Sequence, residues 1–127
     1  MRKRIYVAGP LAPKGVHPAT KHPTIEYLYN VRAMIAGAVE LINRGYSPFC
    51  PGIDFSYFIY SGANISESKI KGVSMDWLRV SDGLLLLPRW KKSAGTLAEI
   101  AEATSIGIPM FESIDELDAH FRNGGKI

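Results

Sequence analysis

The run from Gly83 to Pro88 constrains the fold most, because four consecutive leucines fill it and no polar residue interrupts them. A strand with one face in solvent alternates apolar and polar residues, whereas a continuously apolar run is typical of a central parallel strand covered on both faces. Parallel strands need long crossover connections, which are usually helices. The sequence therefore predicts an α/β fold in which helices cover both faces of a sheet.

The remaining sequence alternates between strand and helix patterns. Strands are predicted at residues 4–8, 46–50, 83–88 and 108–112, and helices at 24–42, about 64–80, 93–105 and 114–122. This alternation over 127 residues predicts a single domain (residues 1–127) with a doubly wound parallel sheet, Rossmann-like or flavodoxin-like, of four to five strands with flanking helices.

Three-four spacing also predicts which helical side chains face the sheet. They are Leu28, Val31, Ile35, Ala38 and Ile42 in the first helix, Ile70, Val73, Trp77 and Val80 in the second, and Leu97, Ile100, Ala101 and Thr104 in the third.

Composition excludes several functional classes. The net charge of +3 arises from 15 basic and 12 acidic residues, which is too weak and too scattered for a duplex nucleic-acid footprint. No apolar stretch is long enough to span a membrane, and the basic start has no signal-peptide core behind it. The single cysteine, Cys50, is expected to be a small buried hydrophobe in a cytoplasmic protein. The three histidines lack metal-site spacing, so no metal is expected.

Ligands of open parallel sheets bind beyond the carboxyl ends of the strands. After the first strand come Gly9 and Pro10, and then a loop whose cationic side chains are suited to attract an anion: Lys14, His17, Lys21 and His22. Neither the dinucleotide fingerprint nor the Walker pattern is present, so no NAD or nucleoside triphosphate is expected.

The central strand leads into a helix start at Ser93. Ser93 and the free N–H groups of Ala94 and Gly95 are suited to bind a phosphate, and Glu99 follows about 9 Å along the helix at 1.5 Å per residue. A carboxylate there can meet a sugar whose phosphate rests on the helix start. The alternative is that Ser93 is only a helix cap and Glu99 a solvated side chain. Glu102 is expected to be structural or solvated.

Three further features bear on a site. Asp76 borders the predicted apolar stripe of its helix, although an ordinary surface aspartate is an equal alternative. Tyr6 is expected to be buried, so its hydroxyl needs a partner such as a carboxylate. Finally, the aromatic group of Tyr57, Phe58 and Tyr60 either covers a base or, more commonly, forms core or dimer contacts.

Together these segments resemble the nucleoside 2-deoxyribosyltransferase-like superfamily, especially its small phage and bacterial branches. The resemblance rests on Tyr6 with Ala8-Gly9-Pro10, on Asp76-Trp77-Leu78 with Asp82, and on Ser93-x-Gly95-x-x-x-Glu99. It implies that Glu99 is a nucleophile, that Asp76 assists the base and that Tyr6 orients the glutamate. It also implies a homo-oligomer that needs no cofactor.

The implied reaction is cleavage of an N-glycosidic bond through a covalent glutamyl-sugar intermediate. Family transferases place an acid at the position of Ser93, whereas nucleoside 5′-monophosphate N-glycosidases place a serine, which favours a nucleotide substrate. The Arg-Gly-Gly-Arg phosphate loop of the latter is absent after Gly9, where Pro10 to Lys14 stand instead. The alternatives are a deoxyribosyltransferase that exchanges bases, a non-catalytic nucleotide-binding or sensing domain, and a structural partner protein with an aromatic interface.

Overall fold

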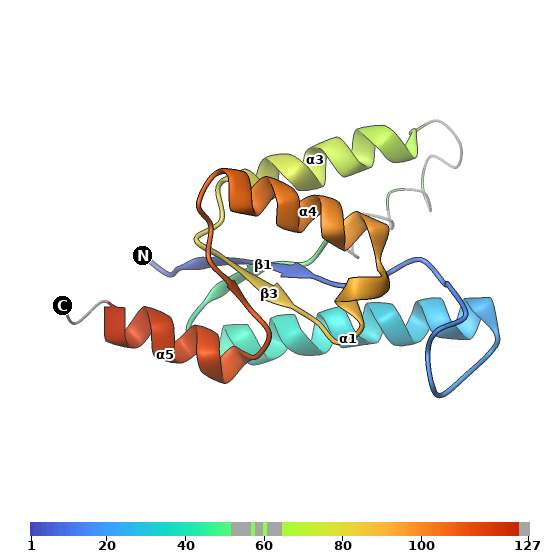
Figure 1. Cartoon of the computed structure of the whole chain (residues 1–127), viewed down its shortest axis with the longest axis horizontal. Coiled ribbons are helices and arrows are strands. Elements are labelled where there is room, and N and C mark those ends of the chain that lie inside the picture. Colours follow the sequence, from blue (N-terminus) through green and yellow to red (C-terminus); the bar gives the residue numbers. More distant parts are fainter. Residues whose placement is uncertain (52–56, 58–59, 61–64, 125–127) are drawn as a thin grey trace.

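A four-stranded parallel sheet forms the centre of the computed structural model, which describes residues 1–51, 57, 60 and 65–124. The strands β1 (Arg4–Ala8), β2 (Ser47–Phe49), β3 (Gly83–Leu86) and β4 (Met110–Phe111) lie in the order β2-β1-β3-β4 (Figure 1). The helices are α1 (Pro23–Asn43), α3 (Glu67–Arg79), α4 (Ala94–Ser105) and α5 (Ile114–Gly124), with a short 3-10 helix, η3 (Trp90–Lys92), before α4. The predicted doubly wound α/β class is confirmed.

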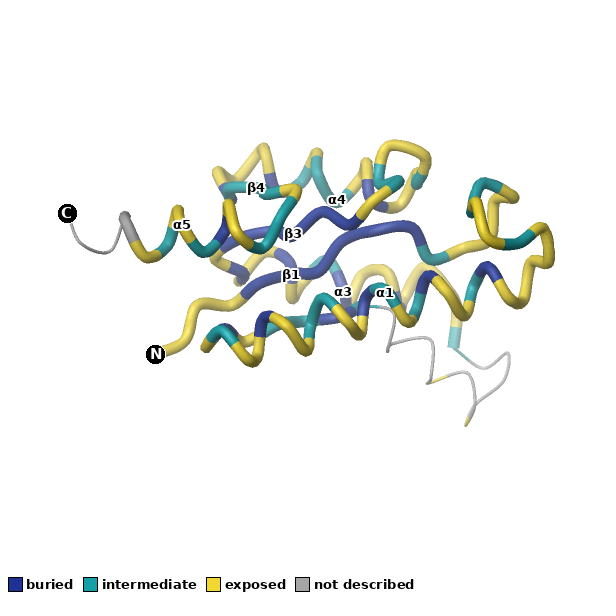
Figure 2. The backbone as a smooth tube through the Cα atoms, turned by 90° about the horizontal axis from the view of Figure 1, so that it is seen from below, coloured by how far each residue is buried: buried dark blue, intermediate teal, exposed yellow. Residues whose placement is uncertain are grey.

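Two apolar layers sandwich the sheet. Ile5 and Val7 pack with residues of α1 and α5, while Tyr6 and Ala8 pack with residues of α3 and α4 on the opposite face. The leucines of β3 divide in the same way, with Leu85 toward α1 and α5. Figure 2 shows β3 buried along its length and β1 buried beyond its exposed first residue, Arg4, as expected for central strands.

Serine caps begin two of the helices. The Ser93 hydroxyl accepts a hydrogen bond from the Thr96 N–H, so α4 starts where the sequence predicts. The Ser66 hydroxyl accepts one from the Lys69 N–H at the start of α3. The predicted start at Asn64 lies outside the described residues. Pro23 occupies the first turn of α1, where its missing N–H has no intrahelical partner to lose.

The predicted inward face of α1 is wrong in part. Ala38 packs against the core, but Leu28, Ile35 and Ile42 are exposed. The buried residues of α1 are Met34 and Leu41, which belong to the core, and Glu26 and Asn30, which contact the loop after β1. The helix carries apolar residues around most of its circumference, so three-four spacing fits more than one face. Glu26 and Asn30 are polar, so their residue types give no reason to expect them on the buried face of α1.

The same error affects α3 and part of α4. In α3 the buried residues are Ile70, Ser74 and Leu78, while Val73, Trp77 and Val80 are exposed. In α4, Thr96 and Ala103 are buried and Ile100 packs against the core, but Leu97, Ala101 and Thr104 are exposed.

The carboxyl ends of β1 and β3 point to the same edge of the sheet (Figure 1). Gly9 and Pro10 are buried there, and a Cβ on Gly9 would lie 2.8 Å from the Leu87 Cβ, so the close approach of these segments requires glycine. Cys50 is buried, as predicted. None of the helices in the described residues is long and apolar enough to cross a membrane.

Candidate functional site

Tyr6 and Glu99 form the centre of the candidate site. Tyr6 is fully buried in β1, and its hydroxyl donates a hydrogen bond to the Glu99 Oε2 on α4. The predicted carboxylate partner of Tyr6 is therefore present, 93 residues away in the sequence. Because Tyr6 engages Oε2, the bond fixes the orientation of the carboxyl group.

Burial controls the charge of Glu99. Desolvation raises the pKa of its carboxyl group to about 7, and the hydrogen bond from Tyr6 acts in the opposite direction by stabilising the carboxylate. Glu99 is half-buried rather than a solvated surface residue. A carboxyl group poised near neutral pH is the kind of perturbed group found at catalytic sites.

An aromatic stack runs from Tyr6 to the surface of α3. The Tyr6 ring stacks on Phe49 with 5.5 Å between ring centroids, and Phe49 stacks on Trp77 at 5.8 Å. Trp77 is 52% exposed, so the stack ends on an accessible indole. These rings form an apolar wall beside the Tyr6–Glu99 pair.

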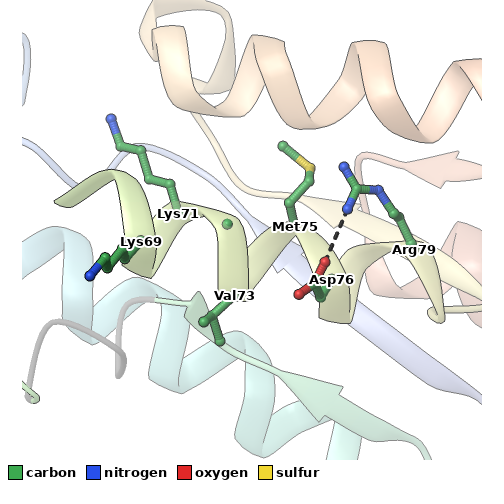
Figure 3. A pocket seen from close by; sticks show the side chains of 7 residues that line it. Lys69, Lys71, Val73, Met75, Asp76 and Arg79 are labelled. Atoms are coloured by element: carbon green, nitrogen blue, oxygen red, sulfur yellow. Dashed lines mark hydrogen bonds and ion pairs between the residues drawn. The ribbon is translucent and has the colours of Figure 1, made fainter. Parts of the chain in front are cut away.

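Asp76 lies on the exposed side of α3 and is joined to α4 indirectly. Its Oδ1 is 3.0 Å from Arg79 Nη1, and Arg79 Nε is 3.1 Å from Oε2 of Glu102, one turn beyond Glu99. Figure 3 shows the pair of Asp76 and Arg79 beside an open hollow. The residues that line this hollow are Lys69, Lys71, Gly72, Val73, Met75, Asp76 and Arg79. Within the described residues, two ion pairs in series, Asp76 with Arg79 and Arg79 with Glu102, thus connect Asp76 to the helix that carries Glu99. Glu102 has a structural role, as predicted.

The start of α4 has the features of an anion site. Ser93 Oγ accepts hydrogen bonds from the N–H and the hydroxyl of Thr96, which use its two lone pairs, so the Ser93 proton is the part of this hydroxyl suited to donate to a ligand. Ala94 and Gly95 are exposed, and a Cβ on Gly95 would meet no heavy atom within 4 Å. The preceding Lys91 and Lys92 are also exposed and add positive charge.

A second hollow lies where β3 ends, lined by residues 86–92 and Glu112. Its wall includes Arg89, which adopts the left-handed conformation (φ 66°), and Trp90, whose indole N–H donates to Glu112 Oε1 at 3.0 Å. The cationic segment before α4 is therefore held in a defined turn.

The loop after β1 is fastened to α1 by two buried polar residues that the sequence did not single out. Glu26 accepts hydrogen bonds from the N–H groups of Lys14 (3.2 Å) and Gly15 (2.8 Å), and Asn30 Nδ2 donates to the Leu11 carbonyl at 3.1 Å. Burial works to raise the pKa of the Glu26 carboxyl, but the loop N–H groups and nearby His17 outweigh it and hold this pKa below its ordinary value. No signal in the sequence pointed to these two residues, because the buried side of α1 could not be identified from the spacing of its apolar residues.

The loop leaves its cationic side chains accessible but not all of its backbone N–H groups. Its N–H groups at Lys14 and Gly15 already bind the Glu26 carboxylate, and the His17 ring stacks on Tyr29. The side chains of Lys14, Lys21 and His22 are exposed. Of the aromatic group, Tyr57 and Tyr60 are exposed and Phe58 lies outside the described residues. Within the described part of the chain, no three His, Cys, Asp or Glu side chains are grouped to hold a metal ion.

No protein-family model matches the chain, and no curated protein matches it either. Among solved structures, the chain is similar to a 2-desoxiribosyltransferase from Leishmania mexicana, with 25% sequence identity, 86% of this chain and 62% of that chain covered, and a TM-score of 0.46. The chain therefore spans less than two thirds of the length of that structure.

Proposed function

We propose that this protein cleaves the N-glycosidic bond of a nucleoside or deoxynucleoside 5′-monophosphate and releases the free base. The observation that carries the proposal is the hydrogen bond from buried Tyr6 to Glu99. It joins a carboxyl group with a raised pKa to a fixed donor, which is an arrangement suited to a positioned nucleophile.

In the first step, one oxygen of the Glu99 carboxylate attacks C1′ of the sugar. The bond between C1′ and the base nitrogen breaks, its electron pair leaves with the base, and the base gains a proton. A glycosyl ester of Glu99 results. In the second step, water attacks C1′, the ester bond breaks and Glu99 regains its carboxylate. The proton that the water loses returns to Asp76, which replaces the one given to the base, and the sugar phosphate leaves with retained configuration.

Asp76 supplies or shares the proton taken by the departing base. The residue is available because its side chain is 75% exposed and its partner Arg79 is also accessible. A base that binds beside α3 exchanges part of the contact between Asp76 and Arg79 for a contact with its own ring nitrogen. The exposed indole of Trp77 and the open hollow along α3 provide an apolar surface next to Asp76.

The substrate phosphate binds at the start of α4, where Ser93, Ala94 and Gly95 offer a hydroxyl proton and unpaired helix N–H groups. The open space at Gly95 and the cationic Lys91 and Lys92 support this placement. Gly9 and Pro10 follow β1 at the same edge of the sheet, next to Leu87, and are the other residues that we assign to substrate binding. A neutral serine at the helix cap favours a phosphate, whereas an acid in its place would repel it.

Base release from a panel of ribo- and deoxyribonucleoside monophosphates, followed by chromatography, tests the proposal. We expect release by the wild type and a loss of about 1,000-fold or more in Glu99→Gln, because the amide cannot form the glycosyl ester. Glu116→Gln, on α5 across the sheet, is the matched control and should keep full activity. Equal release by Glu99→Gln would remove Glu99 from the nucleophile role.

Two further experiments distinguish a nucleotide hydrolase from a base-exchanging transferase and from a non-catalytic binding domain. Ser93→Asp keeps a good helix cap but adds negative charge, so it should weaken monophosphate binding about tenfold or more, with little effect on free nucleosides. Transfer of the sugar to an added acceptor base would identify a transferase instead. Nucleotide binding without release or transfer would identify a non-catalytic binding domain.

A further inference from the structure

The second hollow lies at the carboxyl end of β3, which is the edge where open parallel sheets bind ligands. It has a volume of about 420 Å³, within the range of sites for small molecules. Leu86 and Leu87, both buried, are part of its lining, and Glu112 brings one carboxylate. Three cationic side chains outnumber that carboxylate: Arg89, Lys91 and Lys92. The charge of the hollow therefore favours an anion.

Arg89 is a cation that the protein itself leaves unpaired. Its side chain is half-buried, yet no hydrogen bond or ion pair among the described residues engages its guanidinium. Arg44 is buried to a similar extent and lies within ion-pair distance of three carboxylates. The planar guanidinium of Arg89 thus keeps its N–H donors for a ligand, and this fork matches the oxygens of a phosphoryl group.

The backbone at Arg89 is a second sign of a role in binding. Its φ of 66° lies in the left-handed region, and Arg89 is the one non-glycine residue with a positive φ in the described part of the chain. Glycine adopts this conformation without strain, whereas a side chain makes it unfavourable. Strained residues of this kind cluster at ligand sites. An arginine at a position that suits glycine is explained if its side chain binds something.

Two contacts fix the walls of the second hollow. The Trp90 N–H donates to Glu112 Oε1 at 3.0 Å, which ties the turn after β3 to the segment after β4. Lys91 Nζ lies 5.6 Å from the centroid of the Trp90 ring. The hydrogen bond also occupies one oxygen of Glu112, the only acidic residue of the described lining. Walls that are ordered before binding lose less conformational freedom when a ligand arrives.

We propose that the second hollow binds a phosphoryl group, with the Arg89 guanidinium donating to its oxygens and Lys92 adding positive charge. This position is distinct from that of the substrate phosphate at Ser93. Two sources carry the same chemistry. One is a free phosphate ion. The other is the outer phosphoryl group of a nucleoside 5′-diphosphate whose inner phosphate binds at Ser93, and only this source rests on the proposed function.

The Trp90 indole is a local reporter for the test. It lies in the wall of the second hollow, whereas the other tryptophan, Trp77, lies on α3. In ¹H–¹⁵N spectra of the full chain, recorded in about 150 mM NaCl to screen nonspecific attraction, inorganic phosphate should shift the Trp90 indole peak saturably. The Trp77 peak should stay in place. Trp90→Phe assigns the two peaks.

Variants of Arg89 separate binding from folding. Arg89→Gly removes the guanidinium and relieves the backbone, so the dissociation constant for phosphate should rise about tenfold or more while the Tm stays the same or rises. Arg89→Gln removes the charge alone and should weaken binding as well. Arg32→Gln, at an exposed position on α1, is the matched control for charge and should bind phosphate like the wild type.

Glu112→Gln has the opposite expected effect. The amide keeps an acceptor for the Trp90 N–H but removes the negative charge from the lining, so phosphate binding should become about threefold or more tighter. A variant that binds phosphate more weakly would contradict the placement of the anion in this hollow.

The nucleotides ADP and AMP identify the source, because they differ by one phosphoryl group. Binding of ADP that is about tenfold or more tighter than that of AMP, with the difference lost in Arg89→Gly, assigns the outer phosphoryl group. Equal affinities together with phosphate binding assign the free ion. An inactive protein that still binds phosphate at Arg89 would refute the proposed reaction and leave this site intact. The inference is overturned if neither phosphate nor ADP shifts the Trp90 peak, or if both Arg89 variants keep wild-type binding.

Discussion

The hydroxyl of Tyr6 acts on Glu99 through one hydrogen bond, which lowers a carboxyl pKa that burial raises to about 7. If the ionised form of Glu99 is the nucleophile, kcat/KM should rise with pH around a midpoint near 7. Tyr6→Phe removes the lowering contact, so we expect this midpoint to move to higher pH and activity at pH 7 to fall about tenfold or more. A pH–rate profile measures both effects.

The control is Tyr46→Phe, because the Tyr46 hydroxyl also donates to a carboxylate, Asp118, but near α5 on the other side of the sheet. Its profile should keep the wild-type midpoint. A Tyr6→Phe profile with an unmoved midpoint would mean that Tyr6 does not influence the ionisation of the reacting group.

Glu99 is also expected to destabilise the fold at neutral pH. Its folded pKa, about 7, lies above the unfolded value of 4.5, so between these pH values the folded state holds a proton that the unfolded state has released. The free energy of unfolding therefore falls as pH rises through this window. Glu99→Gln stays neutral and should melt several degrees above the wild type at pH 8, with a smaller difference at pH 5. A Tm difference that does not depend on pH would contradict this reading.

At the scale of elements, the contact between Glu26 and the loop after β1 makes the free energy of unfolding depend on pH in the opposite direction to Glu99. The pKa of Glu26 is held below its ordinary value, so its contribution to stability is present above the unfolded pKa and is lost as pH falls through the folded pKa. Glu26→Gln should lower the free energy of unfolding at pH 7 by about 1–3 kcal/mol, because the amide cannot satisfy both loop N–H groups as well. Chemical denaturation at pH 7 and pH 3 measures the change.

The matched control is the exposed Glu116→Gln, which should be close to neutral at both pH values. Hydrogen exchange at Lys14 and Gly15 should also become faster in Glu26→Gln. Unchanged protection of these two amides would show that the loop does not depend on Glu26.

The segments that follow the parallel strands β1 and β3 lie close together, and this close approach depends on Gly9. A Cβ at this position would meet Leu87 Cβ at 2.8 Å, so Gly9→Ala forces the two segments apart and should destabilise the fold by about 1–3 kcal/mol. Gly72→Ala is the control, since a Cβ there meets nothing within 4 Å and alanine favours a helix interior by about 1 kcal/mol. Thermal melts of both variants should shift in opposite directions.

At the scale of the whole molecule, the sequence predicts the layers better than it predicts the faces of the helices. The apolar run of β3, the serine cap of α4 and the need of Tyr6 for a partner are local signals, and each agrees with the structure. The sequence alone predicted only that the Tyr6 hydroxyl needs a partner such as a carboxylate. The choice of Glu99 as that partner followed from the family resemblance, and the structure shows the hydrogen bond.

The helix faces could not be predicted because α1 and α3 each carry two apolar faces. Periodicity shows that a face exists but not which neighbour covers it, so Ile35 and Val73 were assigned to the core although they are exposed. The hydrogen bonds of Glu26 and Asn30 could not be predicted because they depend on how the loop after β1 packs against α1. The pairing of Arg79 with Glu102 depends on the distance between α3 and α4, whereas its pairing with Asp76 is an i,i+3 contact within α3.

The central position of β1 has a consequence during synthesis of the chain. β1 is made before β3, yet β3 is one of its two neighbours in the sheet, and the backbone N–H of Arg4 donates to a carboxylate oxygen of Asp82, 78 residues further along. Until β3 has been made, the apolar segment Ile5-Tyr6-Val7-Ala8 lacks the neighbour on that side and can join other chains there. The nascent protein is therefore expected to need protection by a chaperone, and fragments that end before β3 should aggregate.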